Sequence, residues 1–187
     1  MRRVAAVLAA AIVATGSTAG CDGKKSGSAA GKCSVTVGVV ECAPGQRAAV
    51  KQVTGELLDG AKYAFGQDNG KVVVVNFWGS WCAPCRAEAD DLEKTFQATK
   101  DKDVVFLGIN TRDDRDSAKA FERGRVTYPS IYDPDGKVGL QVDPTYTVPP
   151  TTLVLDRQGR IAITLHRATT VTELRPLVEK VAAEATG

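Results

Sequence analysis

The segment KVVVVNFWGSWCAPC, residues 71–85, constrains the fold more than any other part of this sequence. Its valine run is rich in β-branched residues and is typical of a strand that is buried on both faces of a sheet. A Gly-Ser pair breaks the run, and Pro84 suits the first turn of a helix, where a missing N–H costs little. We therefore expect a buried strand that leads directly into a helix starting near Cys82 and ending near Ala98.

Further strand and helix patterns flank this unit on both sides. Strands or hairpin arms are expected over residues 34–41, 71–78, 104–110, 128–132, 151–155 and 160–165, and helices over 82–98, 113–123 and 171–184. Strands that alternate with helices imply a parallel central pair with a right-handed crossover, and the last two strands form an antiparallel hairpin. The expected fold class is α/β, with a central mixed β-sheet flanked by helices, an N-terminal hairpin extension and a central insertion.

The first residues of the chain have the pattern of an export signal. Arg2 and Arg3 precede an apolar run, residues 4–14, that is too short to span a bilayer as a mature helix. Small and polar residues then lead to Cys21, in an arrangement that resembles a bacterial lipobox, although Thr18 stands where Leu is usual. The resemblance implies lipidation of Cys21, and the alternative is an ordinary signal peptide in which this cysteine is incidental.

The rest of the chain is expected to form one exported domain. We assign residues 1–20 to the signal, 21–32 to a flexible Gly/Ser/Lys-rich tether, and 33–187 to a single domain. The expected location is extracytoplasmic, with the protein anchored to the cell membrane as a lipoprotein. Without Arg2 and Arg3, 22 basic side chains balance 22 acidic ones, so composition gives no reason to expect nucleic acid as a partner.

Cys82 and Cys85 carry the candidate chemistry. A cysteine at a helix N-terminus is stabilised as a thiolate by unpaired N–H groups and by the helix dipole. Cys82 is therefore expected to attack a disulfide sulfur, and Cys85 to resolve the mixed disulfide that forms. The alternatives are a plain structural disulfide or half of a zinc site. Zinc requires four ligands, which the lone His166 does not complete, so no metal and no cofactor are expected.

The active-site run VVVVNFWGSWCAPCRAEADDLEK resembles thioredoxin-fold proteins of the TlpA/ResA type, which are exported and membrane-attached. The resemblance continues through GELLDGAKYAF, VVFLGINTRDD, YPSIYDPDGK and VPPTTLVLDRQGRI, and so covers about residues 54–185. It implies a thioredoxin-like fold, a redox-active disulfide and reduction of extracytoplasmic partner disulfides, often in cytochrome c maturation. The implied partners are proteins with disulfides or dithiols and a membrane protein that supplies electrons.

Several residues match family positions. Pro150 matches the cis-proline that faces the redox pair, and Glu88 matches an acidic residue close to it that acts on the protonation of Cys85. Trp81 is expected to cover the apolar side of the pair. For Glu88, the alternative is an ordinary charge on a solvated helix face. Asn76 stands where cytosolic thioredoxins have a buried Asp, which makes Glu88 the candidate proton acceptor.

Two further features depart from the family core. Pro149 precedes the expected cis-proline and has no N–H to offer a bound partner. Cys33 and Cys42 form an extra pair, which we expect to be a structural disulfide in an oxidising compartment. The alternative for that pair is a second redox relay to the active site.

The predicted function is that of an extracytoplasmic protein thiol–disulfide oxidoreductase that works as a reductant. The first alternative is a disulfide-forming oxidant of the same fold, because the direction of exchange depends on the reduction potential and the redox partner. The second is a copper-binding chaperone on the same scaffold, because soft thiolates suit Cu(I).

Overall fold

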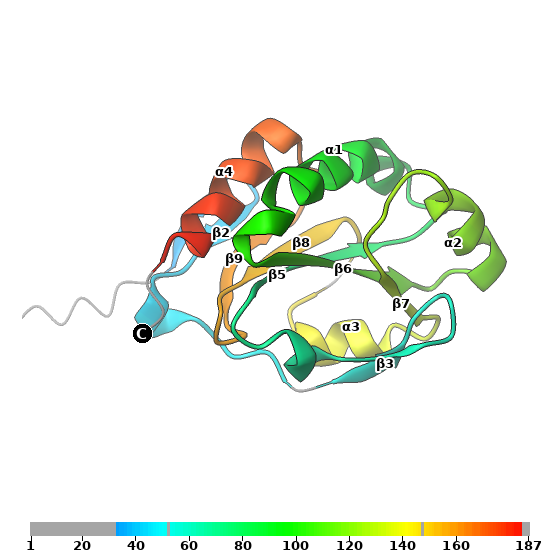
Figure 1. Cartoon of the computed structure of the whole chain (residues 1–187), viewed down its shortest axis with the longest axis horizontal. Helices are drawn as coiled ribbons and strands as arrows, with labels where there is room; N and C mark the ends of the chain where they lie inside the picture. The colour runs from blue at the N-terminus through cyan, green and yellow to red at the C-terminus, as the bar shows by residue number, and fades with distance from the viewer. Residues whose placement is uncertain (1–32, 52, 147, 185–187) are drawn as a thin grey trace, which may run out of the picture.

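The computed structural model describes residues 33–51, 53–146 and 148–184. Seven strands form one sheet in the order β1-β2-β9-β8-β5-β6-β7, and a separate two-stranded sheet pairs β3 with β4 (Figure 1). The strands are β1 (Ser34–Thr36), β2 (Val39–Glu41), β3 (Thr54–Glu56), β4 (Lys62–Ala64), β5 (Val72–Trp78), β6 (Val104–Thr111), β7 (Ser130–Asp133), β8 (Thr151–Leu155) and β9 (Ile161–Leu165). The helices are α1 (Ala83–Thr99), α2 (Arg115–Glu122), α3 (Lys137–Val142) and α4 (Val171–Ala182), with 3-10 turns η1 (Pro44–Gln46), η2 (Phe65–Asp68) and η3 (Lys100–Lys102).

Strand β5 lies in the interior of the large sheet and is buried on both faces, as its valine run predicts. Every residue of this strand is buried, and it pairs in parallel with β6 and antiparallel with β8. Strand β7 extends the parallel side, while β9, β2 and β1 extend the antiparallel side. The expected mixed α/β sheet with a parallel central pair is confirmed.

Two layers of helix cover the sheet. Helices α1 and α4 lie on one face and α3 on the other, while α2 lies beyond the edge formed by β7 (Figure 1). Side chains alternate along a strand, so β5 contributes to the cores on both faces of the sheet. Val72 and Val74 pack in the core beneath α1 and α4, and Val73 and Phe77 pack in the core on the opposite face. Asn76 shares the α1 face by the same alternation. None of the helices in the described ranges is long and apolar enough to cross a bilayer.

Helix α3 is the one α-helix among the described residues that the sequence did not predict. Gly136 begins it with a left-handed φ of 72°, and the carboxylate of Asp133 accepts the N–H groups of Val138 and Gly139 at 3.1 and 2.8 Å. Six helical residues are too few to show an apolar period in the sequence. The helix therefore depends on side-chain capping rather than on a sequence pattern.

The N-terminal extension is a hairpin attached to the antiparallel edge of the sheet. Strand β2 pairs with β9, and a disulfide joins Cys33 to Cys42 across the base of the hairpin, with Cα atoms 4.3 Å apart. The N–H of Cys42 donates to the carbonyl of Ala162, before the middle of β9. This places the disulfide toward the end of the sheet where β5 begins, away from the end where β5 leads into α1.

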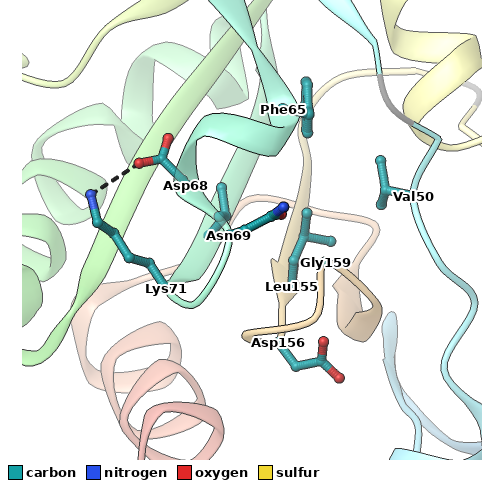
Figure 2. A pocket seen from close by; sticks show the side chains of 9 residues that line it. Val50, Phe65, Asp68, Asn69, Lys71, Leu155, Asp156 and Gly159 are labelled. Carbon is teal, nitrogen blue, oxygen red and sulfur yellow. Dashed lines mark hydrogen bonds and ion pairs between the residues drawn. The ribbon is translucent and has the colours of Figure 1, made fainter. Parts of the chain in front are cut away.

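A buried arginine closes the same end of the sheet. The guanidinium of Arg47 contacts Asp156 at 3.1 Å and Glu184 at 2.6 Å, and its side chain is only 4% exposed. A small pocket nearby is lined by Val50, Phe65 and Leu155 together with the ion pair between Asp68 and Lys71 (Figure 2). Since Leu155 pairs with Val73 at the start of β5, this pocket lies at the opposite end of the sheet from Cys82.

Gly108 makes a close contact that the packing of the sheet depends on. It lies in β6 between Asn76 of β5 and Ser130 of β7, and a Cβ atom there would lie 2.0 Å from the Ser130 hydroxyl and 2.8 Å from Nε1 of Trp78. We expect Gly108→Ala to lower the free energy of unfolding by about 1–3 kcal/mol, because both neighbours are buried and hydrogen-bonded to each other. Urea unfolding measures the change.

Gly45 provides the matched control for this substitution. Nothing lies within 4 Å of a Cβ atom built on Gly45, so Gly45→Ala should leave the unfolding midpoint nearly unchanged. Equal stability of the two variants would show that the sheet accommodates a side chain at Gly108.

Candidate redox-active site

The candidate site lies where β5 ends and α1 begins. Cys82 is the N-cap of α1, and its Sγ accepts the backbone N–H of Cys85 at 3.3 Å. The two cysteines form a disulfide with Cα atoms 5.3 Å apart. The same N–H that contacts Sγ in the disulfide is available to a thiolate at Cys82, so the helix terminus favours the ionised form of this sulfur.

The disulfide is buried on its inner side and bordered by an exposed aromatic ring. Cys82 and Cys85 are 4% and 3% exposed, and they pack in a buried cluster that includes Leu58, Trp78 and Ala118. Trp81 is 55% exposed, and its indole lies over Gly79, where a Cβ atom would come within 2.6 Å of Nε1. The buried apolar neighbour of the pair is thus Trp78, which the sequence did not single out, whereas Trp81, the residue before Cys82, is exposed.

Asp113 holds the loop that precedes Cys82. Its carboxylate accepts the backbone N–H of Ser80 at 2.6 Å, the Ser80 hydroxyl at 2.8 Å, and the amide of Asn110 at 2.8 Å. The side chain of Asp113 thereby ties the end of β6 to the end of β5. The sequence contained a signal for this residue, because it lies two positions after a parallel strand whose carboxyl end must lie beside that of β5.

Glu88 is buried, so the alternative of a solvated helix-face charge is wrong. The residue is 1% exposed; one carboxylate oxygen accepts the amide of Asn76 and the other the backbone N–H of Thr169, both at 2.9 Å. The Asn76 amide also donates to the Thr152 hydroxyl at 3.1 Å. Burial raises the pKa of Glu88 to about 7, against the opposing effect of the hydrogen bonds from Thr169 and Asn76. A carboxyl group that titrates near neutral pH on the helix of Cys85 suits proton transfer.

Pro150 lies at the same end of the sheet as the disulfide. The peptide bond between Pro149 and Pro150 is cis, and the next residue, Thr151, pairs with Phe77 near the end of β5. Val148, just before the two prolines, is 61% exposed. Pro150 itself is buried, so the exposed apolar side chains near this end of the sheet are those of Val148 and Trp81.

The other predicted residues lie apart from this site. Strands β9 and β8 separate the hairpin of Cys33 and Cys42 from β5, so the structure does not bring the two disulfides together. His166 is exposed after β9, where its backbone N–H donates to Gly38. Within the described ranges, no three His, Cys, Asp or Glu side chains gather in a group that could hold a metal ion. Cys21 and the expected signal and tether lie outside the described residues.

Comparison with known proteins agrees with this geometry. The chain is 31% identical over 107 residues to the thiol-disulfide oxidoreductase ResA of Geobacillus kaustophilus, covering 56% of this chain and 59% of that protein. It is 39% identical over 95 residues to the thiol:disulfide interchange protein HelX of Rhodobacter capsulatus, covering 50% of this chain and 51% of that protein. The chain thus spans a little over half the length of these curated relatives.

Solved structures match over a larger share of the chain. A DsbF homologue from Corynebacterium diphtheriae superposes with a TM-score of 0.73 at 37% identity, covering 77% of this chain and 93% of that one. A secreted thiol-disulfide isomerase from Corynebacterium glutamicum gives a TM-score of 0.75 at 31% identity, covering 79% and 93%. The expected thioredoxin-like fold and the resemblance to ResA-type oxidoreductases are both confirmed. The model of the Redoxin family matches residues 43–175, which is most of the described domain, and the chain therefore belongs to the Redoxin family.

Proposed function

We propose that this chain is an extracytoplasmic thiol–disulfide oxidoreductase that reduces disulfides of partner proteins through Cys82 and Cys85. The observation that carries the proposal is the placement of the Cys82 sulfur at the N-terminus of α1, within 3.3 Å of the Cys85 N–H and in a disulfide with Cys85. The names of the relatives, which are thiol-disulfide oxidoreductases and interchange proteins, support the same chemistry.

The exchange proceeds in two steps that conserve sulfur and electrons. The Cys82 thiolate attacks one sulfur of the partner disulfide, forms a mixed disulfide, and releases the other partner sulfur as a thiolate, which takes up a proton. Cys85 loses its proton and attacks the Cys82 sulfur, which forms the internal disulfide and releases the second partner thiol. Two electrons thus pass to the partner, and a membrane protein must return them before the next turnover.

Glu88 is proposed to act on the protonation of Cys85. The two residues lie on one face of α1, one turn apart, and the carboxyl group titrates near neutral pH because it is buried. When Glu88 is ionised, its charge disfavours a second negative charge at Cys85 and keeps that thiol protonated. Cys82 would then be the thiolate of the reduced pair, as the attacking role requires.

We further propose that the protein is exported and anchored through lipid on Cys21. The N-terminal sequence pattern supports export, and the similar isomerase from Corynebacterium glutamicum is described as secreted. Metabolic labelling with a lipid precursor tests the anchor, and a chain with Cys21→Ser is the control that should remain unlabelled.

Cys82→Ser is expected to abolish disulfide exchange, because serine supplies no sulfur for the mixed disulfide. The measurement is reduction of insulin disulfides by the full chain in the presence of a chemical reductant. Cys42→Ser removes a cysteine from the distant hairpin and should keep most of the activity. Exchange that persists in Cys82→Ser would rule out the proposed role of this sulfur.

The proposed direction of electron flow predicts the reduction potential of the pair. A reductant should equilibrate near −270 mV, roughly the range of thioredoxin, whereas a strong oxidant lies near about −120 mV. Equilibration of Cys82 and Cys85 with glutathione buffers, followed by thiol alkylation and mass spectrometry, gives the value. A potential at the oxidising end would leave the exchange chemistry in place and reverse its direction.

Glu88→Gln is expected to change how stability depends on pH. The folded protein holds the Glu88 proton up to about pH 7, whereas an unfolded Glu releases it near pH 4.5. Because the folded state binds this proton more tightly than the unfolded state, protonated Glu88 contributes stability. The contribution is complete below pH 4.5 and is lost as pH rises through 7, a change of roughly 3 kcal/mol in the free energy of unfolding. The oxidised wild type should therefore lose stability over this window, and Glu88→Gln should lose less of it.

Urea unfolding of both oxidised proteins between pH 5 and 8 makes this comparison. Asp156 and Glu184 do not interfere, because their hydrogen bonds to arginine lower their pKa values and move their titration below the window. Parallel pH profiles for wild type and variant would contradict a raised pKa at Glu88.

A further inference from the structure

A small pocket lies beside Cys85, between β5, α1 and the end of α2. It offers ≈ 10 Å³ of space for water, about the minimum that one water molecule needs. Its walls come from the α1 face of β5, from α1, and from the segment that runs from the end of α2 to the start of β7. The lining residues are Asn76, Trp78, Cys85, Ala89, Leu92, Phe121, Glu122, Val126 and Tyr128.

Glu122, the last residue of α2, brings a carboxylate into this otherwise largely apolar space. Its Oε1 atom is fully buried and has no hydrogen-bond partner among the residues that the structure describes. The nearby Ser130 hydroxyl accepts the indole N–H of Trp78 at 3.1 Å. A buried carboxylate oxygen without a partner costs free energy, so its presence in a cavity shared with a reactive cysteine calls for a functional explanation.

The electrostatics of the cavity suit a proton acceptor. Burial raises the pKa of Glu122, and the Ser130 hydroxyl opposes this only in part. Burial also raises the pKa of Tyr128, with additional contributions from the charges of Glu122, Glu88 and Glu93, so the phenol stays neutral. Glu122 is therefore the carboxyl group with a raised pKa that lines this cavity together with Cys85.

Glu88 is less able to receive the proton itself. Both of its oxygens already accept hydrogen bonds, from Asn76 and from Thr169, and its side chain does not line the cavity. Glu122 has a free oxygen and lines the cavity together with Cys85. The two carboxyls thus have different positions relative to the resolving sulfur.

We propose that Glu122 accepts the proton of the Cys85 thiol, through one water in the cavity, when Cys85 resolves the mixed disulfide. The proton moves from Cys85 Sγ to the water, and a water proton moves to Glu122, while the Cys85 thiolate attacks the Cys82 sulfur and the partner leaves as a thiolate. When the internal disulfide is reduced again, Glu122 returns the proton to Cys85. The inference rests on the proposed exchange function and assigns its second step to a carboxyl on another helix.

The resolving step can be observed without the natural partner. The full chain, in a Cys21→Ser background, is reduced with one equivalent of dithiothreitol and mixed with excess dithiobis(nitrobenzoate). Attack by Cys82 releases the first nitrothiolate at a rate that rises with reagent concentration. Resolution by Cys85 releases the second nitrothiolate at a rate that is independent of reagent concentration. Stopped-flow absorbance therefore separates the two steps.

Glu122→Gln is the main variant, because glutamine keeps the shape of the side chain and carries no charge to bury. We expect its second step to slow at least tenfold at pH 7, while its first step stays within about twofold of wild type. The rate of its second step should also rise about tenfold per pH unit, because solvent must then take the proton, whereas the wild-type rate should be flatter near neutral pH. Asp116→Asn, at an exposed carboxylate on the same helix, is the control and should change neither step.

A second variant separates proton transfer from a merely structural role. Glu122→Ala leaves space for a small carboxylate, and added formate should speed its second step several-fold without affecting wild type. The proposed role of Glu122 would be overturned if the second step of Glu122→Gln were as fast as that of wild type. It would also be overturned if the second step of Glu122→Ala were slow and formate did not speed it. Absence of a concentration-independent second step in the wild type would instead count against the proposed function.

Discussion

The hydrogen bond from the Cys85 N–H to the Cys82 sulfur depends on one constraint, the burial of β5 on both faces. Strand β5 is buried on both faces and paired with β6 and β8 on its two edges, so the residue that follows it has a fixed position relative to both neighbours. The loop of Gly79 and Ser80 is then tied to Asp113 at the end of the neighbouring strand. The helix dipole can act on the Cys82 sulfur because these contacts hold the sulfur at the helix terminus.

Much of this arrangement could be predicted from the sequence. The valine run, the break after Trp78 and the position of Pro84 predict the strand, the loop and the helix that meet at Cys82. The strand patterns at residues 151–155 and 160–165 predict the antiparallel hairpin of β8 and β9, which the structure contains. These predictions succeed because each depends on local periodicity or on a turn residue, both of which a single sequence displays.

The remaining features depend on contacts between distant segments, which no local pattern reveals. Glu88 is buried because Asn76 and Thr169 satisfy its oxygens, and Thr169 lies 81 positions away. Trp78, rather than Trp81, packs beneath the disulfide because β5 ends in that orientation. In the sequence, Glu122 is one more charged residue in a polar helix. In the fold, it lines a pocket together with residues of α1. For the two carboxyls, the change of role follows from tertiary contacts that remove a polar group from water.

The hairpin disulfide and the Arg47 ion pairs lie at the end of the sheet where β5 begins, whereas Cys82 follows the end of β5. A strand of this length separates the two ends by roughly 20 Å. Whatever precedes Cys33 therefore joins the domain at one pole, and the reactive sulfurs lie at the other. A partner that exchanges disulfides with Cys82 therefore approaches the domain from the end opposite to Cys33.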